Sequence, residues 1–411
     1  MKKQNNRPIF KKKILIEGPV IFLVGPIGTF FSRLANYFEK NNIKTYKVDF
    51  PLYEYGFPKS SRLNYSDDIY KFKEYLENII IKNNIKHIFM YGNVLIPHRQ
   101  AIAVSEELEK KGIFVNTHIF ELGYLRPNFV TIEDKGVNYS SSFILGSDFY
   151  GKQKSYKQLP IPYKQGLRIR KIWKLISFIN HSFKNYKIVE FEHKLQPKPI
   201  YLWFQLKGFF LKFIYRLVEK KLKKNCFSKE PFFLVILQVA TDSQILQGSK
   251  FKDNFDFIYS VIREFSSSQL KNTKLVFKHH PRDRGYTDYS KFILKISKEF
   301  KIKNKVFYFH DFPLSKIFRN NFCKGTVLIN STVGYQSLFH SIPVKALGIS
   351  PYNFEGLTDQ NDLVSFFKKP QKVNKELFNK FYKYILENSQ INGNFDGYFP
   401  FESVFIFLNN L

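Results

Sequence analysis

The chain has 411 residues, of which 44% are hydrophobic and 24% are charged, and 47 are Phe. This composition excludes a disordered chain and gives enough apolar side chains for two or three domains, each with its own core. The 65 Lys and Arg residues outnumber the 34 Asp and Glu residues, so the formal net charge is +31. Such a surplus predicts an anionic partner, namely nucleic acid, anionic lipid or a phosphorylated substrate.

Two further features bear on the compartment. Only two cysteines are present, Cys226 and Cys323, which excludes a disulfide framework and a cysteine metal cluster and fits a reducing cytoplasm. The first apolar run is broken by Glu17, Gly18 and Pro19, so we expect no signal peptide. No apolar stretch reaches the roughly 18 uninterrupted residues of a transmembrane helix.

The first part of the chain alternates predicted strands and helices. Strands are expected at 20–25, 44–50, 87–93 and 112–121, and helices at 30–40, 66–84 and 98–111. This order predicts a parallel sheet in a doubly wound domain that spans residues 1–163. Gly28 lies between the first strand and the first helix, a geometry in which backbone N–H groups meet an anion. An ordinary strand–helix turn explains the glycines equally well.

Residues 164–229 have a different composition and are expected to link two domains. Between residues 164 and 224 there are 16 Lys or Arg and 3 Asp or Glu, interleaved with aromatic side chains. Helices over 169–183 and 201–224 would be amphipathic with a basic face, as helices on an anionic membrane are. Alternatively, they are linker helices that pack their aromatics on the domains and show lysines to water. No RNA- or DNA-binding motif accompanies the charge, so we expect no nucleic acid partner.

A second alternating series occupies residues 230–370. Its predicted strands are 232–238, 274–280, 306–311, 326–331 and 343–348, with helices near 251–265, 288–300, 313–321 and 332–341. The series predicts a second doubly wound α/β domain. Two such Rossmann-like domains facing a cleft describe a GT-B type architecture. Residues 371–411 are expected to be a C-terminal helical segment, with a helix at 374–388.

The strand at 232–238 ends in a cluster of polar groups. Gln238 closes the strand, and Asp242 and Gln244 follow it within six residues. In open α/β sheets, ligands bind beyond the carboxyl ends of the strands. We therefore expect Asp242 to lie nearest the reacting atom, while a helix N-cap is the alternative role for the same aspartate.

Two more strand ends carry groups suited to a nucleotide. The first, KHHPRDRG, contains Lys278, His279, His280 and Pro281, and the second, NSTVG, contains Asn330, Ser331 and Thr332. The first offers donors to a phosphate or a cytidine ring, where a plain His–Pro turn is the alternative. The second leads from a strand into a helix, so its hydroxyls and N–H groups form a phosphate cradle. An ordinary Ser/Thr N-cap has the same pattern, and both roles can coexist.

A carboxylate also lies at the end of the predicted strand 112–121. Glu121 there is suited to general acid/base chemistry. The alternative is an ion pair between Glu121 and Arg126 that stabilises the loop. No HExxH motif, DxD-type pair or Cys/His spacing is visible, so we expect neither a metal nor a cofactor.

Six segments in this order resemble the bacterial capsule polysaccharide biosynthesis proteins of the KpsS type. They are GPIGTFFSRLA, YGNVLIPHRQAIAVSEELEKKGIFV, FELGYLRPNFVTIEDKGVN, LQVATDSQI, KHHPRDRG and NSTVGYQSLFHSIPVKALGISPYNFEGLTDQ. The resemblance covers residues 18–145 and 230–370 and does not include the basic aromatic segment between them.

The resemblance implies a GT-B fold and a β-Kdo transferase that builds the Kdo linker of a capsule on a phosphatidylglycerol lipid. The implied donor is CMP-β-Kdo, and the anomeric configuration is retained. The enzyme would be cytoplasmic and peripheral on the inner face of the cytoplasmic membrane. Its implied partners are CMP-Kdo, the lipid acceptor, the anionic inner-membrane surface and other capsule assembly proteins.

Residue roles carry over by position in the motifs. Asp242 matches the motif aspartate and is the implied nucleophile, and Glu121 is the implied acid/base. His280 with Pro281 matches a nucleotide-holding pair, and Ser331 with Thr332 matches a phosphate-binding pair. The positions Gln238, Gln244, Arg126 and Asn138 match family positions without a separate role. The chain departs from the family pattern at Leu122, where an acidic residue is usual, and at Ala240, where proline is usual.

Two other functions stay open at this point. One is a GT-B transferase that uses another nucleotide donor. The other is a non-catalytic, membrane-associated scaffold for capsule export and assembly, which would use the basic surface and not the carboxylates.

Overall fold

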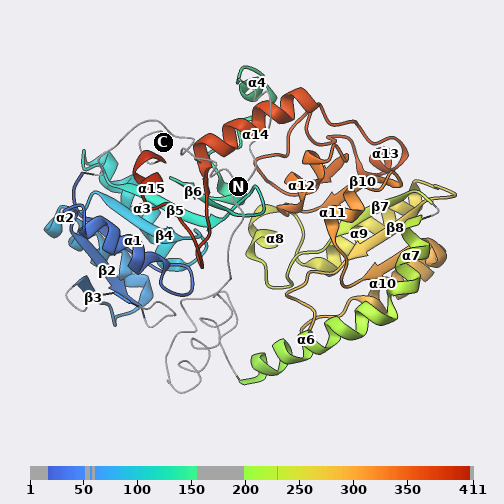
Figure 1. The fold of residues 1–411 in the computed structure, drawn as a ribbon, viewed down its shortest axis with the longest axis horizontal. Coiled ribbons are helices and arrows are strands. Elements are labelled where there is room, and N and C mark those ends of the chain that lie inside the picture. The colour runs from blue at the N-terminus through green and yellow to red at the C-terminus, as the bar shows by residue number, and fades with distance from the viewer. Residues whose placement is uncertain (1–16, 51–55, 58–60, 155–198, 229, 408–411) are drawn as a thin grey trace, which may run out of the picture. The chain divides into compact units, whose positions relative to one another are not determined.

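The computed structural model describes residues 17–50, 56–57, 61–154, 199–228 and 230–407 (Figure 1). These residues form two compact units. The first contains the described residues up to Val137 and those from Lys383 onward, and the second contains Asn138 to Lys154 and Pro199 to Tyr382. The predicted helix at 169–183 lies outside the described residues.

The first unit is a seven-stranded sheet with helices on both faces. Its strands are β1 Val20–Phe22, β2 Thr45–Asp49, β3 Arg62–Asn64, β4 His87–Tyr91, β5 Asn116–Leu122, β6 Phe129–Glu133 and β12 Gln390–Asn392, and its helices are α1 Phe30–Glu39, η2 Ile69–Lys71, α2 Phe72–Asn83, α3 Ile96–Lys110 and α15 Glu402–Phe407. The five strands β3-β2-β1-β4-β5 are parallel and in Rossmann order. The predicted strands and helices are confirmed to within a few residues.

Alternate residues of the strands feed two cores. Val20 and Phe22 of β1 pack with α1, whereas Ile21 of the same strand packs with α2 and α3. Because the strand is buried on both faces, its sequence is a continuous apolar run with no polar alternation. In Figure 1 these helices surround the sheet of the first unit.

Two strands of this sheet run antiparallel to their neighbours, which the predicted parallel sheet did not include. β6 pairs antiparallel with β5, and β12 pairs antiparallel with β6, about 260 residues further along the chain. The predicted helical segment 371–411 therefore also contains a strand. Such a pairing depends on a distant three-residue segment, so no local periodicity reveals it.

The second unit is an all-parallel five-stranded sheet with the order β11-β10-β7-β8-β9. Its strands are β7 Phe232–Ile236, β8 Lys274–Lys278, β9 Val306–Phe309, β10 Cys323–Leu328 and β11 Val344–Ala346, and its helices are η3 Asn138–Ser140, α4 Gly146–Gly151, α6 Pro199–Val218, α7 Lys220–Ser228, α8 Ser243–Gly248, α9 Asn254–Ser267, α10 Ser290–Glu299, η5 Lys303–Lys305, α11 Leu314–Phe318, α12 Val333–Phe339, α13 Leu363–Lys368 and the first part of α14 Lys375–Ser389. Helices α9, α10 and α13 bury one face of the sheet in a shared core. The predicted second α/β domain is confirmed.

Both sheets reverse strand order at one place. In the second unit the reversal lies between β7 and β10, because the chain moves from β7 to β8 on one side and later to β10 on the other. In the first unit it lies between β1 and β4. In open α/β sheets, ligands bind in the crevice beyond the strand ends at this reversal.

The polar core of the first unit generates a prediction. Gln390 is 1% exposed, accepts hydrogen bonds from the Tyr124 and Leu125 N–H groups, and donates to Thr131 and Ser389. Gln390→Leu would leave buried donors and acceptors unpaired. We expect the free energy of unfolding to fall by about 2–4 kcal/mol, measured by chemical denaturation.

Gln360→Leu is the matched control, because the Gln360 amide is exposed and water replaces its hydrogen bonds. That change should stay within about 0.5 kcal/mol of the unmodified protein. Equal stability losses in both variants would contradict a structural role for the buried amide.

Candidate functional site

The loop after β7 positions Asp242 at the start of α8. The chain leaves the buried strand at Leu237, turns so that the Asp242 N–H donates to the Val239 carbonyl, and enters the helix at Ser243. The Asp242 Oδ1 atom accepts from the Gln244 N–H at 3.0 Å, so Asp242 is the N-cap of α8. The capping role predicted as the alternative is therefore present. It leaves the second carboxylate oxygen for other partners.

That second oxygen is held by Gln238. The Gln238 Nε2 atom donates to Asp242 Oδ2 at 3.1 Å, and its Oε1 atom accepts from the Asn330 N–H at 3.4 Å. Asn330 in turn donates from Nδ2 to the Gln244 carbonyl at 3.0 Å. Since Asn330 follows β10 and Gln238 follows β7, these bonds join the two loops at the strand-order reversal of the second sheet.

A buried network fixes the loop from the other side. The Ala240 N–H donates to Asp283 Oδ2 at 3.0 Å, and the Tyr289 hydroxyl donates to the same oxygen at 3.3 Å. Asn254 donates to the Gln238 carbonyl and to the Tyr289 hydroxyl. The loops after β7 and β8 are thus tied together, which restricts where Asp242 can point.

The side chains of the KHHPRDRG run differ in burial and in their hydrogen-bond partners. His280 is half-buried at the end of β8, and its Nδ1 atom accepts from the Arg282 N–H at 3.2 Å. His279 is 1% exposed and bonds to the Tyr308 hydroxyl at 2.7 Å, and burial together with neighbouring His310 lowers its pKa to about 3. His279 is therefore buried in the unit, whereas His280 is only half-buried beyond the end of β8.

Lys278 is also buried. Its ammonium lies 5.4 Å from the centre of the Phe312 ring and donates to the His279 carbonyl at 3.3 Å. Burial lowers its pKa to about 8, although Asp311 opposes the shift. Lys278 therefore loses its proton at a lower pH than a lysine in water does.

The Ser331–Thr332 pair lies between β10 and α12. The Ser331 Oγ atom accepts from the Val333 N–H at 3.3 Å, and the Ser331 carbonyl accepts from Gly334 and from the Tyr352 hydroxyl. Thr332 is the N-cap by position, without a side-chain capping bond. Here too a local capping role coexists with the place beyond the strand ends.

Asn138 opens the second unit and lies in η3, which contacts α8. The approach is close at Gly248, the last residue of α8, where a Cβ atom would come within 2.8 Å of Tyr139. Only a residue without a side chain allows this packing. The segment containing Asn138 is therefore fixed against the helix that Asp242 caps.

The first unit holds the other predicted site residues. Gly28 has a φ of 113°, which requires glycine, and precedes α1 beyond the end of β1. Glu121 lies near the end of β5, where its Oε1 atom accepts from the Tyr91 hydroxyl at 3.2 Å and from the Leu122 N–H at 2.8 Å. Arg126 is exposed and donates to the Gly123 carbonyl.

Two side-chain oxygens beside Asp242 are buried and have no hydrogen-bond donor in the described structure. They are Gln244 Oε1 and Asn330 Oδ1. Folded proteins rarely leave buried acceptors unpaired, and a bound molecule or water commonly explains such cases. Within the described ranges, no three His, Cys, Asp or Glu side chains are placed to hold a metal ion.

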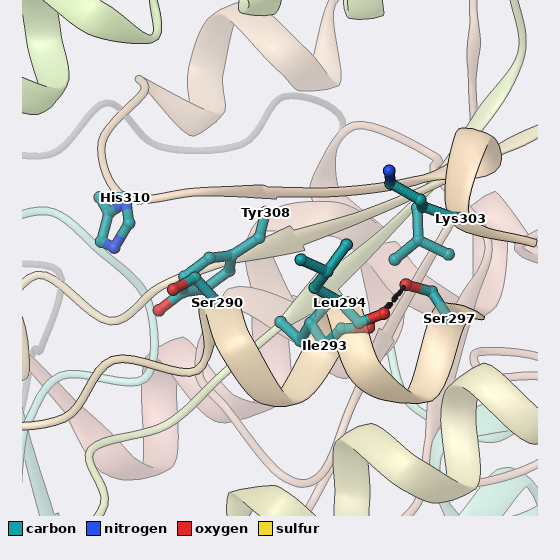
Figure 2. Close-up of a pocket in the computed structure, with 8 residues that line it drawn as sticks. Ser290, Ile293, Leu294, Ser297, Lys303, Tyr308 and His310 are labelled. Carbon is teal, nitrogen blue, oxygen red and sulfur yellow. Dashed lines mark hydrogen bonds between the residues drawn. The ribbon is translucent and has the colours of Figure 1, made fainter. Parts of the chain in front are cut away.

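A cavity of about 290 Å³ lies elsewhere in the second unit, between α10 and β9. Figure 2 shows Tyr308 and His310 at one end of it and Ser297 and Lys303 at the other. None of the predicted site residues lines this cavity, so it is separate from the Asp242 cluster.

Three residues that position the predicted site residues, Asp283, Asn254 and Tyr91, were not predicted from the sequence. Asp283 stood inside the quoted KHHPRDRG run, and Asn254 follows the N-cap of α9, yet neither was assigned a role. Tyr91, which donates to Glu121, was missed as well. A carboxylate flanked by two arginines was the available signal for Asp283.

The structure contains two Rossmann-like units, and a polar cluster lies at the strand-order reversal of the second one. Two units of this kind define an α/β protein of the GT-B class. Residues 87–396 match the family described as "Capsule polysaccharide biosynthesis protein". The chain belongs to this family, and the resemblance seen in the sequence is confirmed.

The relatives match over nearly the whole chain. Capsule polysaccharide modification protein LipB of Neisseria meningitidis serogroup B is 32% identical over 395 residues, covering 92% of this chain and 91% of LipB. Capsule polysaccharide export protein KpsS of Escherichia coli is 30% identical over 392 residues, covering 92% of this chain and 97% of KpsS. Among solved structures, KpsC of Thermosulfurimonas dismutans, a "beta Kdo 2,7 transferase", is 15% identical with a TM-score of 0.43, covering 96% of this chain and 99% of that one.

The Asp283 carboxyl generates a pH prediction. Burial raises its pKa from 3.8 to about 6, against the opposing effect of the Ala240 and Tyr289 hydrogen bonds. The folded protein thus holds this proton more tightly than the unfolded chain. The stability that the group contributes is present below pH ~4 and is lost as the pH rises through ~6.

Asp283→Asn removes this titration. The free energy of unfolding of the variant, relative to the unmodified protein, should therefore rise between about pH 4 and pH 7, by up to ~3 kcal/mol. Denaturant titrations across this range measure the difference. Parallel stability curves for the two proteins would show that Asp283 does not titrate as described.

Proposed function

We propose that this chain is a retaining β-Kdo glycosyltransferase that moves Kdo from CMP-β-Kdo to a phosphatidylglycerol-type lipid and starts the linker of a capsular polysaccharide. Membership of the capsule polysaccharide biosynthesis family supports the setting. One observation carries the chemistry, namely that both oxygens of Asp242 are oriented by hydrogen bonds beyond the end of β7.

The Asp242 carboxylate is our nucleophile. Each of its oxygens accepts one hydrogen bond, from the Gln244 N–H or from the Gln238 amide, and retains a second lone pair. The side chain is half-buried, so it remains within reach of a ligand. A carboxylate fixed in one orientation loses little freedom when it attacks, which lowers the barrier.

Retention of configuration requires two displacements. In the first, a carboxylate oxygen of Asp242 bonds to the anomeric carbon of Kdo, while the bond to the CMP phosphate breaks and CMP leaves with the electron pair. In the second, an acceptor hydroxyl bonds to the same carbon and the Asp242 carboxylate leaves. We assign Glu121 to take the acceptor proton in this second step.

Donor binding is assigned to the loops around Asp242. His280, next to Pro281, faces the cytidine nucleotide, and Ser331 with Thr332 faces its phosphate. Developing negative charge on CMP needs N–H groups and cations, and no metal is required for this. The buried oxygens Gln244 Oε1 and Asn330 Oδ1 suit a ligand that carries hydroxyl donors, as a sugar does.

Intact-protein mass spectrometry after incubation with CMP-Kdo tests both donor and mechanism. We expect a mass increase of one Kdo residue in Glu121→Gln, where acceptor transfer is slowed, and none in Asp242→Asn. Kdo transfer to a phosphatidylglycerol-type acceptor should fall at least ~10³-fold in Asp242→Asn. Asparagine caps helices as well as aspartate does, so stability should change by less than about 1 kcal/mol.

Asp362→Asn is the matched control, because Asp362 caps α13 through the Ser365 N–H as Asp242 caps α8. It should keep full transfer activity. An Asp242→Asn protein that is folded and fully active would refute the nucleophile. Turnover of CDP-glycerol without turnover of CMP-Kdo would instead redirect the donor assignment.

A further inference from the structure

Helix α6 exposes an unusual row of large apolar side chains. Their exposed fractions are Trp203 63%, Leu206 47%, Phe209 57%, Phe210 64%, Phe213 49%, Ile214 51%, Leu217 76% and Val218 65%. Exposed apolar residues are ordinarily scattered, and a contiguous group marks an interaction surface. We call this group the α6 apolar face.

The α6 apolar face is one side of the helix. Leu206, Phe210, Phe213 and Leu217 follow the spacing i, i+4, i+7, i+11, which places them in one stripe. In the sequence analysis, the alternative for this segment was a helix that packs its aromatics on a domain and shows lysines to water. That alternative holds for Phe204 and Tyr215, which pack on Tyr286 and His310. It does not hold for the aromatics of the α6 apolar face, which are exposed.

The opposite side of the helix packs on the rest of the second unit through Gly208, Tyr215 and Glu219, and through Phe204, whose ring lies 5.1 Å from that of Tyr286. Gly208 lies against Gly285, where a Cβ atom on Gly208 would come within 3.2 Å of the Gly285 N–H nitrogen. The Tyr215 ring stacks on the His310 ring, with centroids 3.5 Å apart and planes 5° apart. The rotation of α6 about its axis is therefore restricted by close contacts.

A buried ion pair adds to this restriction. Glu219, between α6 and α7, is 6% exposed and accepts from His310 Nδ1 at 2.6 Å and from the His310 N–H at 3.2 Å. Lys223 forms an ion pair with Glu219 at 3.1 Å and donates to the Asp311 carbonyl. Turning the apolar face inward would move Glu219 out to water, break its bonds to His310 and Lys223, and leave the buried His310 without this partner, which is unfavourable.

Charge indicates the partner. Glu219 is the single acidic residue between Pro199 and Ser228, and it faces inward, whereas six cations accompany the apolar face. They are Lys207, Lys212, Arg216, Lys220, Lys221 and Lys224. The apolar stripe thus continues into a basic one, the pattern of helices that lie in the interface of an anionic bilayer.

Charge also disfavours two other occupants. A second copy would bring an equally basic surface against this one, and like charges repel. The preceding stretch of sequence, residues 164–198, has 9 Lys or Arg and 2 Glu and is basic as well. Within the described part of the chain, no helix is long and apolar enough to cross a membrane.

We propose that the α6 apolar face inserts into the surface of an anionic lipid bilayer, with Lys220, Lys221 and Lys224 of α7 against the headgroups. The proposal rests on α6 and α7 and needs no assumption about the sugar donor. Figure 1 shows α6 as a long helix at the edge of the second unit.

Co-sedimentation of the full chain with vesicles tests the proposal. Vesicles of phosphatidylcholine with phosphatidylglycerol should bind the protein, and vesicles of phosphatidylcholine alone should bind it more weakly. The triple variant Phe210→Gln, Phe213→Gln, Leu217→Gln should lower the partition coefficient at least ~10-fold. Glutamine keeps a good helix propensity, and circular dichroism with a thermal midpoint checks that the variant is folded.

The matched control is the double variant Tyr70→Gln, Phe114→Gln, which changes exposed aromatics of the first unit, 69% and 66% exposed. It should bind vesicles as the unmodified protein does. Made in the Glu121→Gln protein, the triple variant should still acquire the Kdo adduct, which separates this proposal from the proposed function. An equal loss of vesicle binding in both variants, or none in either, overturns the role of α6.

Tryptophan fluorescence gives a second readout. The chain has two Trp residues, so Trp173→Phe leaves Trp203 as the only indole. Its emission should shift to the blue with anionic vesicles and be quenched by brominated lipid. An unshifted emission while the protein sediments overturns insertion at α6. A protein that fails to sediment but dimerises, with the triple variant monomeric by light scattering, assigns the face to a second copy.

Discussion

Two side-chain amides connect the two loops on which the candidate site depends. Gln238 is 5% exposed, and it both donates to Asp242 and accepts from the Asn330 backbone, while the Asn330 side chain donates to the Gln244 carbonyl. The strand order reverses between β7 and β10, and in open α/β sheets the loops beyond such a reversal border the ligand. Because Gln238 joins these loops, it sets both the direction of the carboxylate and the distance between the loops.

The same arrangement makes the N-cap role of Asp242 compatible with the nucleophilic role proposed for it. The N-cap uses one carboxylate oxygen, and the Asp242 backbone is extended, with ψ of 113°. A side chain held in one orientation suits the proposed attack, since an attacking group gains from being held before the reaction. Ser331 is also held locally, with its hydroxyl bound to the Val333 N–H at the start of α12.

How much the sequence predicts depends on how local the physical signal is. The strands β7 and β8 are short apolar runs followed by polar residues, so their positions and the Asp242 and His280 loops were predictable. The antiparallel pair β6 and β12 was not, because its partners are far apart in the chain. The difference in burial between His279 and His280 was also hidden, since it depends on which way each side chain turns beyond Lys278, where β8 ends.

The orientation of α6 shows a related limit. Its sequence has an apolar side and a side with Gly208, Tyr215 and Glu219, and composition alone favours burying the apolar one. The structure buries the other side, because Glu219 pairs with His310 and Lys223, and the Tyr215 ring stacks on the His310 ring. A pattern gives two faces of a helix, but only the partners decide which of them turns inward.

The course of the chain after residue 374 has a consequence for dissecting the protein. Helix α14 begins in the second unit and ends in the first, where β12 then covers the edge of β6. No single cut in the polypeptide therefore yields two self-sufficient pieces. A fragment that stops before Gln390 would present the open backbone of β6, and exposed strand edges of this kind recruit other chains and aggregate.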